Sequence, residues 1–226
     1  MAVTGSIALN FGLQDQYRIT DSITLCCWAN LSSSSTFPCL ISRGILNAGD
    51  SYCLYQNNSN QLCFGFCYGA ASGSRYIIVY TPTIHGVLHH FAGVRDRAAG
   101  KMYIYVDGVP VVDTNVSSTL YIYNGTVPLY VGNNSRPLSG IIFDARVYNR
   151  ALSAAEIAGI CGARGCDNVL DSSLVLRTCI NNGYAWNSLT GQTVYDHSTF
   201  KNQAAGSGSM SVAEDPYGTV KSPLIL

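Results

Sequence analysis

Cysteine and histidine are the residue types in this sequence whose chemistry first suggests a metal or redox site. The chain of 226 residues has nine cysteines and four histidines, of which His89 and His90 are adjacent. Successive residues of a β-strand face opposite sides of the sheet, so these two imidazoles are not expected to bind one ion. The cysteines include no C-x-x-C pair, the spacing typical of structural zinc sites. We therefore predict no metal site here and a structural role for both histidines.

Two of the cysteines are predicted to face each other across a β-hairpin. Cys53 and Cys63 lie in two β-rich runs, and a three-residue turn at 57–59 would place Cys53 opposite Cys63. Side chains at facing positions can meet the geometry of a disulfide. Buried thiols that pack as small apolar residues are the alternative. An odd number of cysteines leaves at least one thiol unpaired or linked to another chain.

Carboxylates are too few and too scattered to predict glycoside hydrolysis. The sequence has eleven aspartates but only two glutamates, Glu156 and Glu214. A retaining glycosidase needs two carboxyl groups about 5–5.5 Å apart. The serines include no nucleophile elbow, the strained Gly-x-Ser-x-Gly turn between a strand and a helix. We predict that the protein is not an enzyme and has no catalytic residue.

Charged residues are scarce and balanced. They make up 12% of the chain, about half of the usual ~25%, and 13 basic residues face 13 acidic ones. This composition excludes the basic surface that nucleic acid or anionic lipid requires. No apolar run of about 18 residues predicts a membrane span. The first residues, 1–8, lack the basic and apolar regions of a secretory signal, so we expect synthesis in the cytosol.

Strands dominate the elements that would position these residues. β-rich runs alternate with Gly, Asn, Ser and Asp, a pattern typical of an antiparallel sandwich. Asp107-Gly108 predicts a type I′ hairpin, because both turn residues need positive φ. Ser153 and Glu156 form a capping box that predicts one short helix. The predicted strands are 6–11, 22–29, 51–56, 61–68, 76–80, 87–95, 101–106, 109–113, 127–132 and 140–148.

The order of these motifs resembles the laminin-G-like domains of the concanavalin A-like lectin/glucanase superfamily. The most specific landmark is residues 140–157, where Tyr148-Asn149-Arg150 precedes the capping box. The resemblance covers about residues 6–160 and implies an all-β fold, a two-sheet antiparallel β-sandwich (jelly roll) with one short helix. The other landmarks are residues 23–29, 40–44, 88–94 and 102–108.

The family's opening strand is displaced in this sequence. A Leu-Val strand at 173–176 and an Asp-x-Ser-x-x-x-Asn pattern at 196–202 follow the main body instead of preceding it. We predict a single, circularly permuted sandwich over 1–226, because permutation is tolerated where termini lie close together. Its parts are a main body at 1–160, a connector at 161–168 and a C-terminal segment at 169–226. Alternatively, the C-terminal segment completes a neighbouring subunit's sandwich.

The resemblance also implies which residues bind ligands. Glycan binding is common in the family and uses exposed aromatic rings with nearby amide or carboxylate groups. The loop-like candidates are Tyr121, Tyr123, Asn124, Tyr184 and Trp186. Some members bind calcium, for which the Asn133-Asn134-Ser135 loop and the turn near Asp113 offer oxygen ligands. Phe143 before Asp144 departs from the family's paired acids, which argues against calcium.

Two functions agree with these observations. The first is a non-enzymatic structural protein on a particle surface, such as a viral (phage) capsid decoration or tail-associated protein. Its partners would be capsid or other virion proteins and further copies of itself in a homo-oligomer, and its location the virion surface. The neutral surface rich in Ser, Thr and Asn motivates this reading. The alternative is a freestanding extracellular lectin that binds cell-surface glycans.

Overall fold

The computed structural model describes residues 2–32, 37–44, 50–69, 75–83, 86–133, 135–136, 138–167, 171–178, 193–207 and 210–213. The described elements are β1 (Ala2–Asn10), η1 (Asp15–Tyr17), β2 (Ile23–Leu31), β3 (Cys39–Arg43), β4 (Tyr52–Gln56), β5 (Gln61–Tyr68), β6 (Arg75–Thr83), β7 (Leu88–Asp96), β8 (Lys101–Val106), β9 (Val109–Asn115), β10 (Tyr130–Gly132), β11 (Leu138–Tyr148), α1 (Ala154–Ala163), β12 (Leu174–Thr178), β13 (Thr193–Tyr195), β14 (Gln203–Ser207) and β15 (Met210–Ala213).

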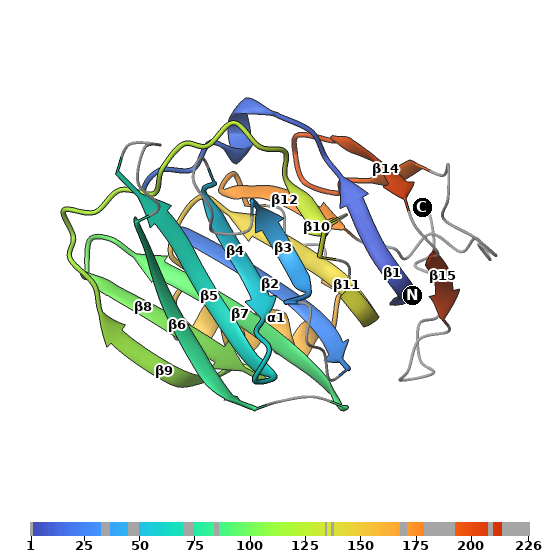
Figure 1. Cartoon of the computed structure of the whole chain (residues 1–226), viewed down its shortest axis with the longest axis horizontal. Coiled ribbons are helices and arrows are strands. Elements are labelled where there is room, and N and C mark those ends of the chain that lie inside the picture. The colour runs from blue at the N-terminus through green and yellow to red at the C-terminus, as the bar shows by residue number, and fades with distance from the viewer. Residues whose placement is uncertain are drawn as a thin grey trace.

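The strands form two antiparallel sheets that lie face to face (Figure 1). The front sheet has the order β6-β5-β4-β3-β10, and the back sheet has the order β9-β8-β7-β2-β11. Strand β1 joins them, because residues 3–7 pair with β11 whereas residues 8–10 pair with β10. This arrangement confirms the predicted all-β, two-sheet antiparallel sandwich with one short helix.

Strand β2 shows why the core lies between the sheets. Ile23, Leu25 and Cys27 point into the main hydrophobic core, whereas Cys26 belongs to a second buried cluster on the outer face of the back sheet. A strand covered on both faces is apolar along its whole length rather than alternating. On β7, a Cβ at Gly93 would come within 2.4 Å of the Phe64 side chain, so the sheets approach too closely there for any other residue.

Helix α1 covers the outer face of the back sheet and begins as predicted. The Ser153 hydroxyl accepts the Glu156 N–H, and the Glu156 carboxylate accepts the Ser153 N–H, which confirms the capping box. The helix continues to Ala163, so residues 161–163 of the predicted connector are helical. A helix tolerates an interior glycine at a cost of about 1 kcal/mol, and α1 ends only at Arg164, which adopts left-handed φ and ψ.

The two predicted hairpins differ in outcome. Asp107 and Gly108 have φ of 51° and 79°, which confirms the Asp-Gly turn. The β4–β5 hairpin turns one residue later than predicted, because Asn60 adopts the left-handed conformation and the Asn57 side chain accepts the N–H groups of Ser59 and Gln61.

That one-residue shift of the β4–β5 turn moves the register of the hairpin by two. Cys53 lies opposite Gly65, and Cys63 lies opposite Tyr55. The predicted placement of Cys53 opposite Cys63 is therefore wrong.

The C-terminal segment packs on the main body. Strand β12 pairs with β11, β14 with β1, and β13 with β14. The buried Asp196 carboxylate accepts hydrogen bonds from Ser198, Asn202 and the Arg177 N–H. The Asp-x-Ser-x-x-x-Asn pattern thus closes its own loop beside β12, while circular permutation stays a prediction. No helix in the described residues has the length and apolar character to cross a bilayer.

Candidate functional site

Three of the predicted glycan-binding residues share one loop. Tyr121, Tyr123 and Asn124 lie between β9 and β10, whereas Tyr184 and Trp186 lie outside the described residues. The loop docks on the end of β5, where Ile122 forms a β-bridge with Tyr68 and the Tyr123 N–H donates to the Cys67 carbonyl at 2.8 Å. We call residues 116–125 the clamped loop.

Three arginines, one in β3, one in β7 and one directly after β7, hold the backbone of the clamped loop. Arg95 of β7 donates to the carbonyl oxygens of Val116 and Ser117 at 3.4 and 2.8 Å. Arg97, directly after β7, donates to the Ser118 carbonyl at 2.8 Å. Arg43 of β3 donates to the Gly125 carbonyl at the far end of the loop. A loop held at both ends loses little further conformational entropy when a ligand binds.

Tyr121 presents an aromatic ring to solvent. Its side chain is 54% exposed, and the guanidinium of Arg97 lies 4.2 Å from the ring centroid. Arg97 is itself held by Asp21, whose carboxylate accepts its Nε–H at 2.8 Å. This hydrogen bond lowers the pKa of Asp21. A cation–π contact of this kind fixes the orientation of an otherwise mobile exposed ring.

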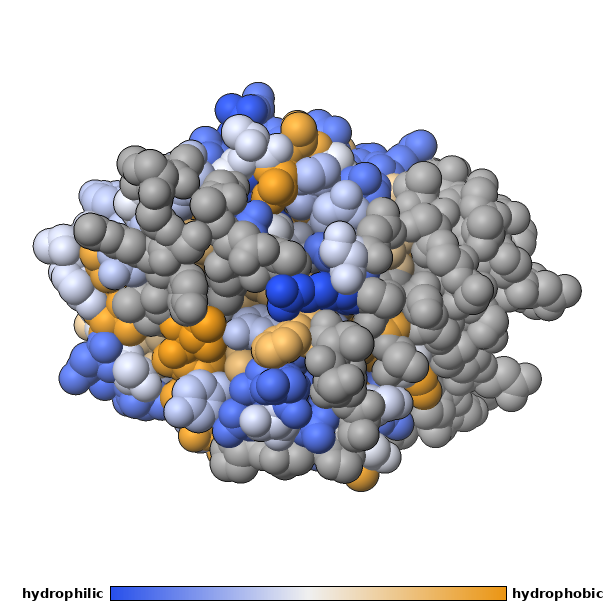
Figure 2. Space-filling view, viewed as in Figure 1, coloured by the Kyte–Doolittle hydropathy of each residue, from blue (hydrophilic) through white to orange (hydrophobic). Residues whose placement is uncertain are grey.

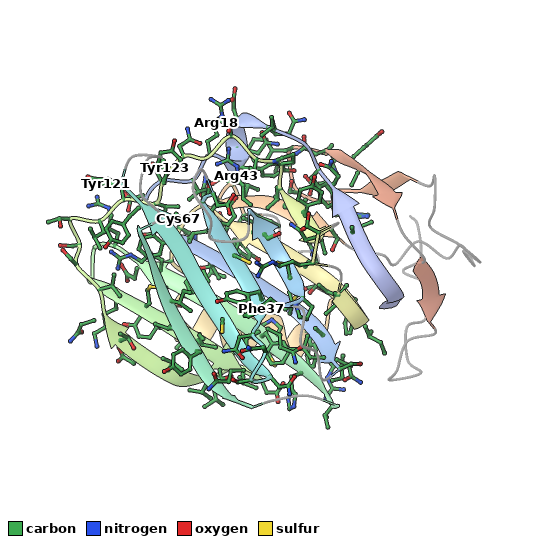
Figure 3. All side chains as sticks on the ribbon, viewed as in Figure 1. Arg18, Phe37, Arg43, Cys67, Tyr121 and Tyr123 are labelled. Carbon is green, nitrogen blue, oxygen red and sulfur yellow. The ribbon has the colours of Figure 1, made fainter. Side chains whose placement is uncertain are left out.

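Tyr123 is half-buried, on the side of the clamped loop nearer the middle of the front sheet. It packs against a buried thiol cluster that Cys39, Cys53 and Cys67 form on the outer face of that sheet. In Figure 3 the labels of Tyr121, Tyr123 and Arg43 lie along the upper part of the molecule, with Cys67 beside Tyr123. The ring is therefore supported from below, and its remaining surface faces outward.

Asn124 is exposed, but its amide is oriented from the interior. The Oδ1 atom accepts a hydrogen bond from Nη1 of Arg43 at 3.1 Å, so the NH₂ group points away from Arg43. Arg43 is 1% exposed and also donates to the Ser51 hydroxyl at 3.0 Å. That hydroxyl accepts the Gly125 N–H at 2.9 Å. Burial lowers the pKa of Arg43.

The clamped loop thus combines two tyrosine rings with a fixed amide donor. Sugars offer apolar C–H faces to aromatic rings and hydroxyl groups to amides, so this combination suits a saccharide. Figure 2 shows hydrophilic and hydrophobic side chains side by side along the upper edge of the same face. Arg43 and Ser51 were not among the predicted site residues. The one sequence feature that pointed to Arg43 is its position in residues 40–44, a landmark of the family resemblance.

The other predicted ligand groups have partners within the protein. Asp113 forms an ion pair with Lys101 at 2.8 Å. Buried Asn133 accepts the Ser135 N–H and donates to the Ser42 hydroxyl, whereas Asn134 lies outside the described residues. Among the described residues, no group of three or more His, Cys, Asp or Glu side chains is placed to hold a metal ion.

The adjacent histidines bind one carboxylate rather than one ion. Asp107 accepts from His89 Nδ1 at 2.7 Å and from the backbone N–H of His90 at 2.9 Å. The His90 ring is 1% exposed, and burial together with the charge of Arg146 lowers its pKa to about 4. His90 is therefore a neutral, buried ring at pH 7.

A second polar region lies on the outer face of the back sheet. Arg146 and Arg177 are buried, and both bind the carboxylates of Asp144 and Asp167. We call these four residues the ionic cluster. Next to it, a cavity of about 300 Å³ opens beside α1. Its walls are formed by Arg146, Tyr148, Arg150, Leu152, Glu156, Gly159, Ile160, Asp167 and Asp171.

Comparisons with known proteins agree with the fold. The Laminin_G_3 family model of the concanavalin A-like lectin/glucanases superfamily matches residues 4–158. No curated protein matches the sequence. Among solved structures, a candidate carbohydrate-binding protein from Bacteroides ovatus superposes with a TM-score of 0.66 at 15% identity. That superposition covers 96% of this chain, which spans 61% of the Bacteroides protein.

Two further structures share the sandwich. The CBM40 domain of a Ruminococcus gnavus sialidase matches with a TM-score of 0.55 at 16% identity, over 71% of this chain and 96% of that domain. A structure of botulinum neurotoxin type C matches with a TM-score of 0.52 at 13% identity. Cell entry of that toxin depends on interaction with two ganglioside molecules. The match covers 73% of this chain and 46% of the neurotoxin chain. At such low identity these likenesses establish the fold alone.

Proposed function

Because the chain belongs to the Laminin_G_3 family of the concanavalin A-like lectin/glucanases superfamily, we propose that it is a carbohydrate-binding module whose clamped loop holds the sugar. The observation that carries the proposal is the pair of Asn124 and Tyr123. The first has an amide donor whose orientation is set by buried Arg43, and the second has a ring supported by the sheet.

Each side chain of the clamped loop has a distinct part in binding. The rings of Tyr121 and Tyr123 cover the C–H face of a saccharide, which removes apolar area from water. The Asn124 NH₂ group donates to a sugar hydroxyl oxygen. Because the loop is already held by Arg43, Arg95 and Arg97, little ordering cost opposes these contacts.

The lectin reading replaces the particle-surface reading as the leading function. The structural relatives described above are carbohydrate-binding proteins and a toxin that depends on gangliosides, and none of these three is a virion protein. The proposed activity is binding without turnover, in line with the carbohydrate-binding modules among those relatives.

Glycan-array screening of the full chain, followed by calorimetry on the best ligand, tests the proposal. We expect Tyr123→Ala to lower affinity tenfold or more, which corresponds to about 1.4 kcal/mol. Tyr103→Ala is the matched control, because Tyr103 is also half-buried and packs on a buried cluster, but on the back sheet. Equal loss in both variants, or an array with no bound glycan, would contradict the proposal.

A further inference from the structure

We infer that Cys39 and Cys53 form a disulfide when the protein folds in the presence of an oxidant. Their sulfur atoms lie 3.7 Å apart across neighbouring strands β3 and β4. Both residues are 1% exposed and belong to the thiol cluster beneath Tyr123. The inference concerns the front sheet alone and does not depend on carbohydrate binding.

The register explains why these two thiols meet. Cys39 lies opposite Tyr55, so Cys53 is its diagonal neighbour on the same face of the sheet. Diagonal neighbours are normally about 7–8 Å apart. Here the register shifts between Cys39 and Ile41, and a bulge of this kind bends a strand locally. The bulge is therefore our explanation for the close approach of the Cys39 sulfur to Cys53.

The predicted partner of Cys53 is less well placed than Cys39. Cys63 of β5 lies opposite Tyr55 of β4, whereas Cys53 faces Gly65. The Cys63 thiol points back along its own strand, where it donates to the Gln61 carbonyl at 3.6 Å. A Cys53–Cys63 bond would require a change of hairpin register, whereas a Cys39–Cys53 bond requires only that two sulfurs in contact close to about 2.05 Å.

The reaction is a thiol–disulfide exchange with a small-molecule disulfide such as oxidised glutathione. One thiolate attacks the glutathione disulfide. One glutathione stays bound to the protein sulfur as a mixed disulfide, and the other leaves. The second thiolate then attacks the protein sulfur and releases the second glutathione. Two protein thiols are oxidised to one disulfide, and the two glutathiones leave reduced and carry the two thiol protons.

Burial sets when this exchange takes place. Desolvation raises the pKa of Cys53 well above the value of a free thiol, and the neighbouring Cys39 raises it further. The folded protein therefore holds little of the reactive Cys53 thiolate at neutral pH. We expect the bond to close while β3 and β4 pair during folding, and to form only slowly once the sheet is complete.

The bond would tie together the strands that support the clamped loop. Arg43 and Ser51, which hold Asn124 and Gly125, both lie between the two cysteines in sequence. A cross-link between positions 14 residues apart removes entropy from the unfolded chain. For a domain of this size we expect the melting temperature to rise by about 5–10 °C.

Peptide mapping of the wild-type chain tests the inference. The reduced chain is refolded with oxidised glutathione, remaining thiols are alkylated under denaturing conditions, and the protein is digested with trypsin and chymotrypsin. Cleavage after Arg43, Tyr55 and Phe64 separates Cys39, Cys53, Cys63 and Cys67 from one another. We expect one linked peptide pair that contains Cys39 and Cys53, two hydrogens lighter than the sum of its parts.

Two variants separate this bond from any other. Cys53→Ser should lose the linked pair and the rise in melting temperature, whereas the matched control Cys63→Ser should keep both. Alkylation of both Cys39 and Cys53 after oxidative refolding would overturn the inference, as would a bond from either to another cysteine. If Cys53→Ser fails to fold, the wild-type peptide map alone decides between these results.

Discussion

The molecule buries arginine in two different ways, and the ionic cluster and Arg43 are the clearest examples. In the ionic cluster of the back sheet, Arg146 and Arg177 bind two carboxylates. At the end of the front sheet, the side-chain hydrogen bonds of Arg43 to the described residues reach a hydroxyl, an amide and a carbonyl oxygen. Both kinds of guanidinium are almost inaccessible to water, yet among the described residues only the first kind is bonded to carboxylates.

The difference corresponds to what each region joins. The ionic cluster connects β11 to Arg177 of β12, so it holds the C-terminal segment on the main body. Buried ion pairs resist separation, because breaking one leaves an uncompensated charge. Arg43 instead orders a loop that reaches solvent, and its acceptors on that loop are the neutral Asn124 amide and the Gly125 carbonyl.

The largest effect is expected when the ionic cluster is broken. Arg146→Met removes one cation and leaves Asp144 and Asp167 to share Arg177, so we expect the free energy of unfolding to fall by about 3–5 kcal/mol. Denaturant unfolding measures this change. Arg150→Met is the matched control, because Arg150 pairs with Glu156 and Asp171 at a site 38% exposed and should cost about 1 kcal/mol or less. Equal losses would contradict the distinction.

The next effect is a loss of stability in acid that originates at His90. Its pKa is about 4 in the folded protein and about 6.5 when unfolded, so the unfolded chain takes up the proton first as pH falls. The contribution of neutral His90 to the free energy of unfolding is fully present above pH 6.5, and it decreases by about 3 kcal/mol as pH falls to 4. In His90→Phe the melting temperature should depend less on pH across this range than it does in the wild-type protein. An unchanged slope in that variant would assign the acid sensitivity elsewhere.

Removal of Arg43 should lower both the stability of the protein and its affinity for a glycan. Arg43→Met breaks charge-assisted hydrogen bonds but also removes a buried cation that is bonded to no carboxylate of the described residues, so we expect a net loss of about 1–2 kcal/mol. The Asn124 amide then loses its fixed orientation, and glycan affinity should fall about tenfold in calorimetry. Asn124→Ala should give the same affinity loss with a smaller loss of stability, because it removes only one of these hydrogen bonds, which separates the two effects.

The smallest effect tests the comparison directly. Asn124→Asp gives Arg43 a carboxylate partner, so that Arg43 forms an ion pair as Arg146 does. Because residue 124 is exposed and solvent screens the pair, we expect a gain of only about 0.5–1 kcal/mol at pH 7. The amide donor disappears, so glycan affinity should nevertheless fall. A gain in both stability and affinity would contradict the assigned role of the Asn124 NH₂ group.

Local patterns of a few residues predicted local structure correctly. The capping box at Ser153 and the Asp107-Gly108 turn are satisfied within a few residues, and both were confirmed. The Cys53–Cys63 prediction failed because one left-handed residue, Asn60, moved the turn. Asparagine and serine fill the whole turn, and several of them tolerate the same conformation. The site residue Arg43 was missed because its partners lie up to 82 positions away.

Residue patterns in the sequence were enough to predict the sandwich and the loop that carries Tyr121, Tyr123 and Asn124. Alternation of apolar residues, turn chemistry and capping depend on neighbours within a few positions, which the sequence displays directly. The folded structure was needed to show which buried cations bind carboxylates, which amide atom faces solvent and which two thiols touch. Those properties depend on strand register and burial, because a shift of a single turn residue changes every cross-strand pair.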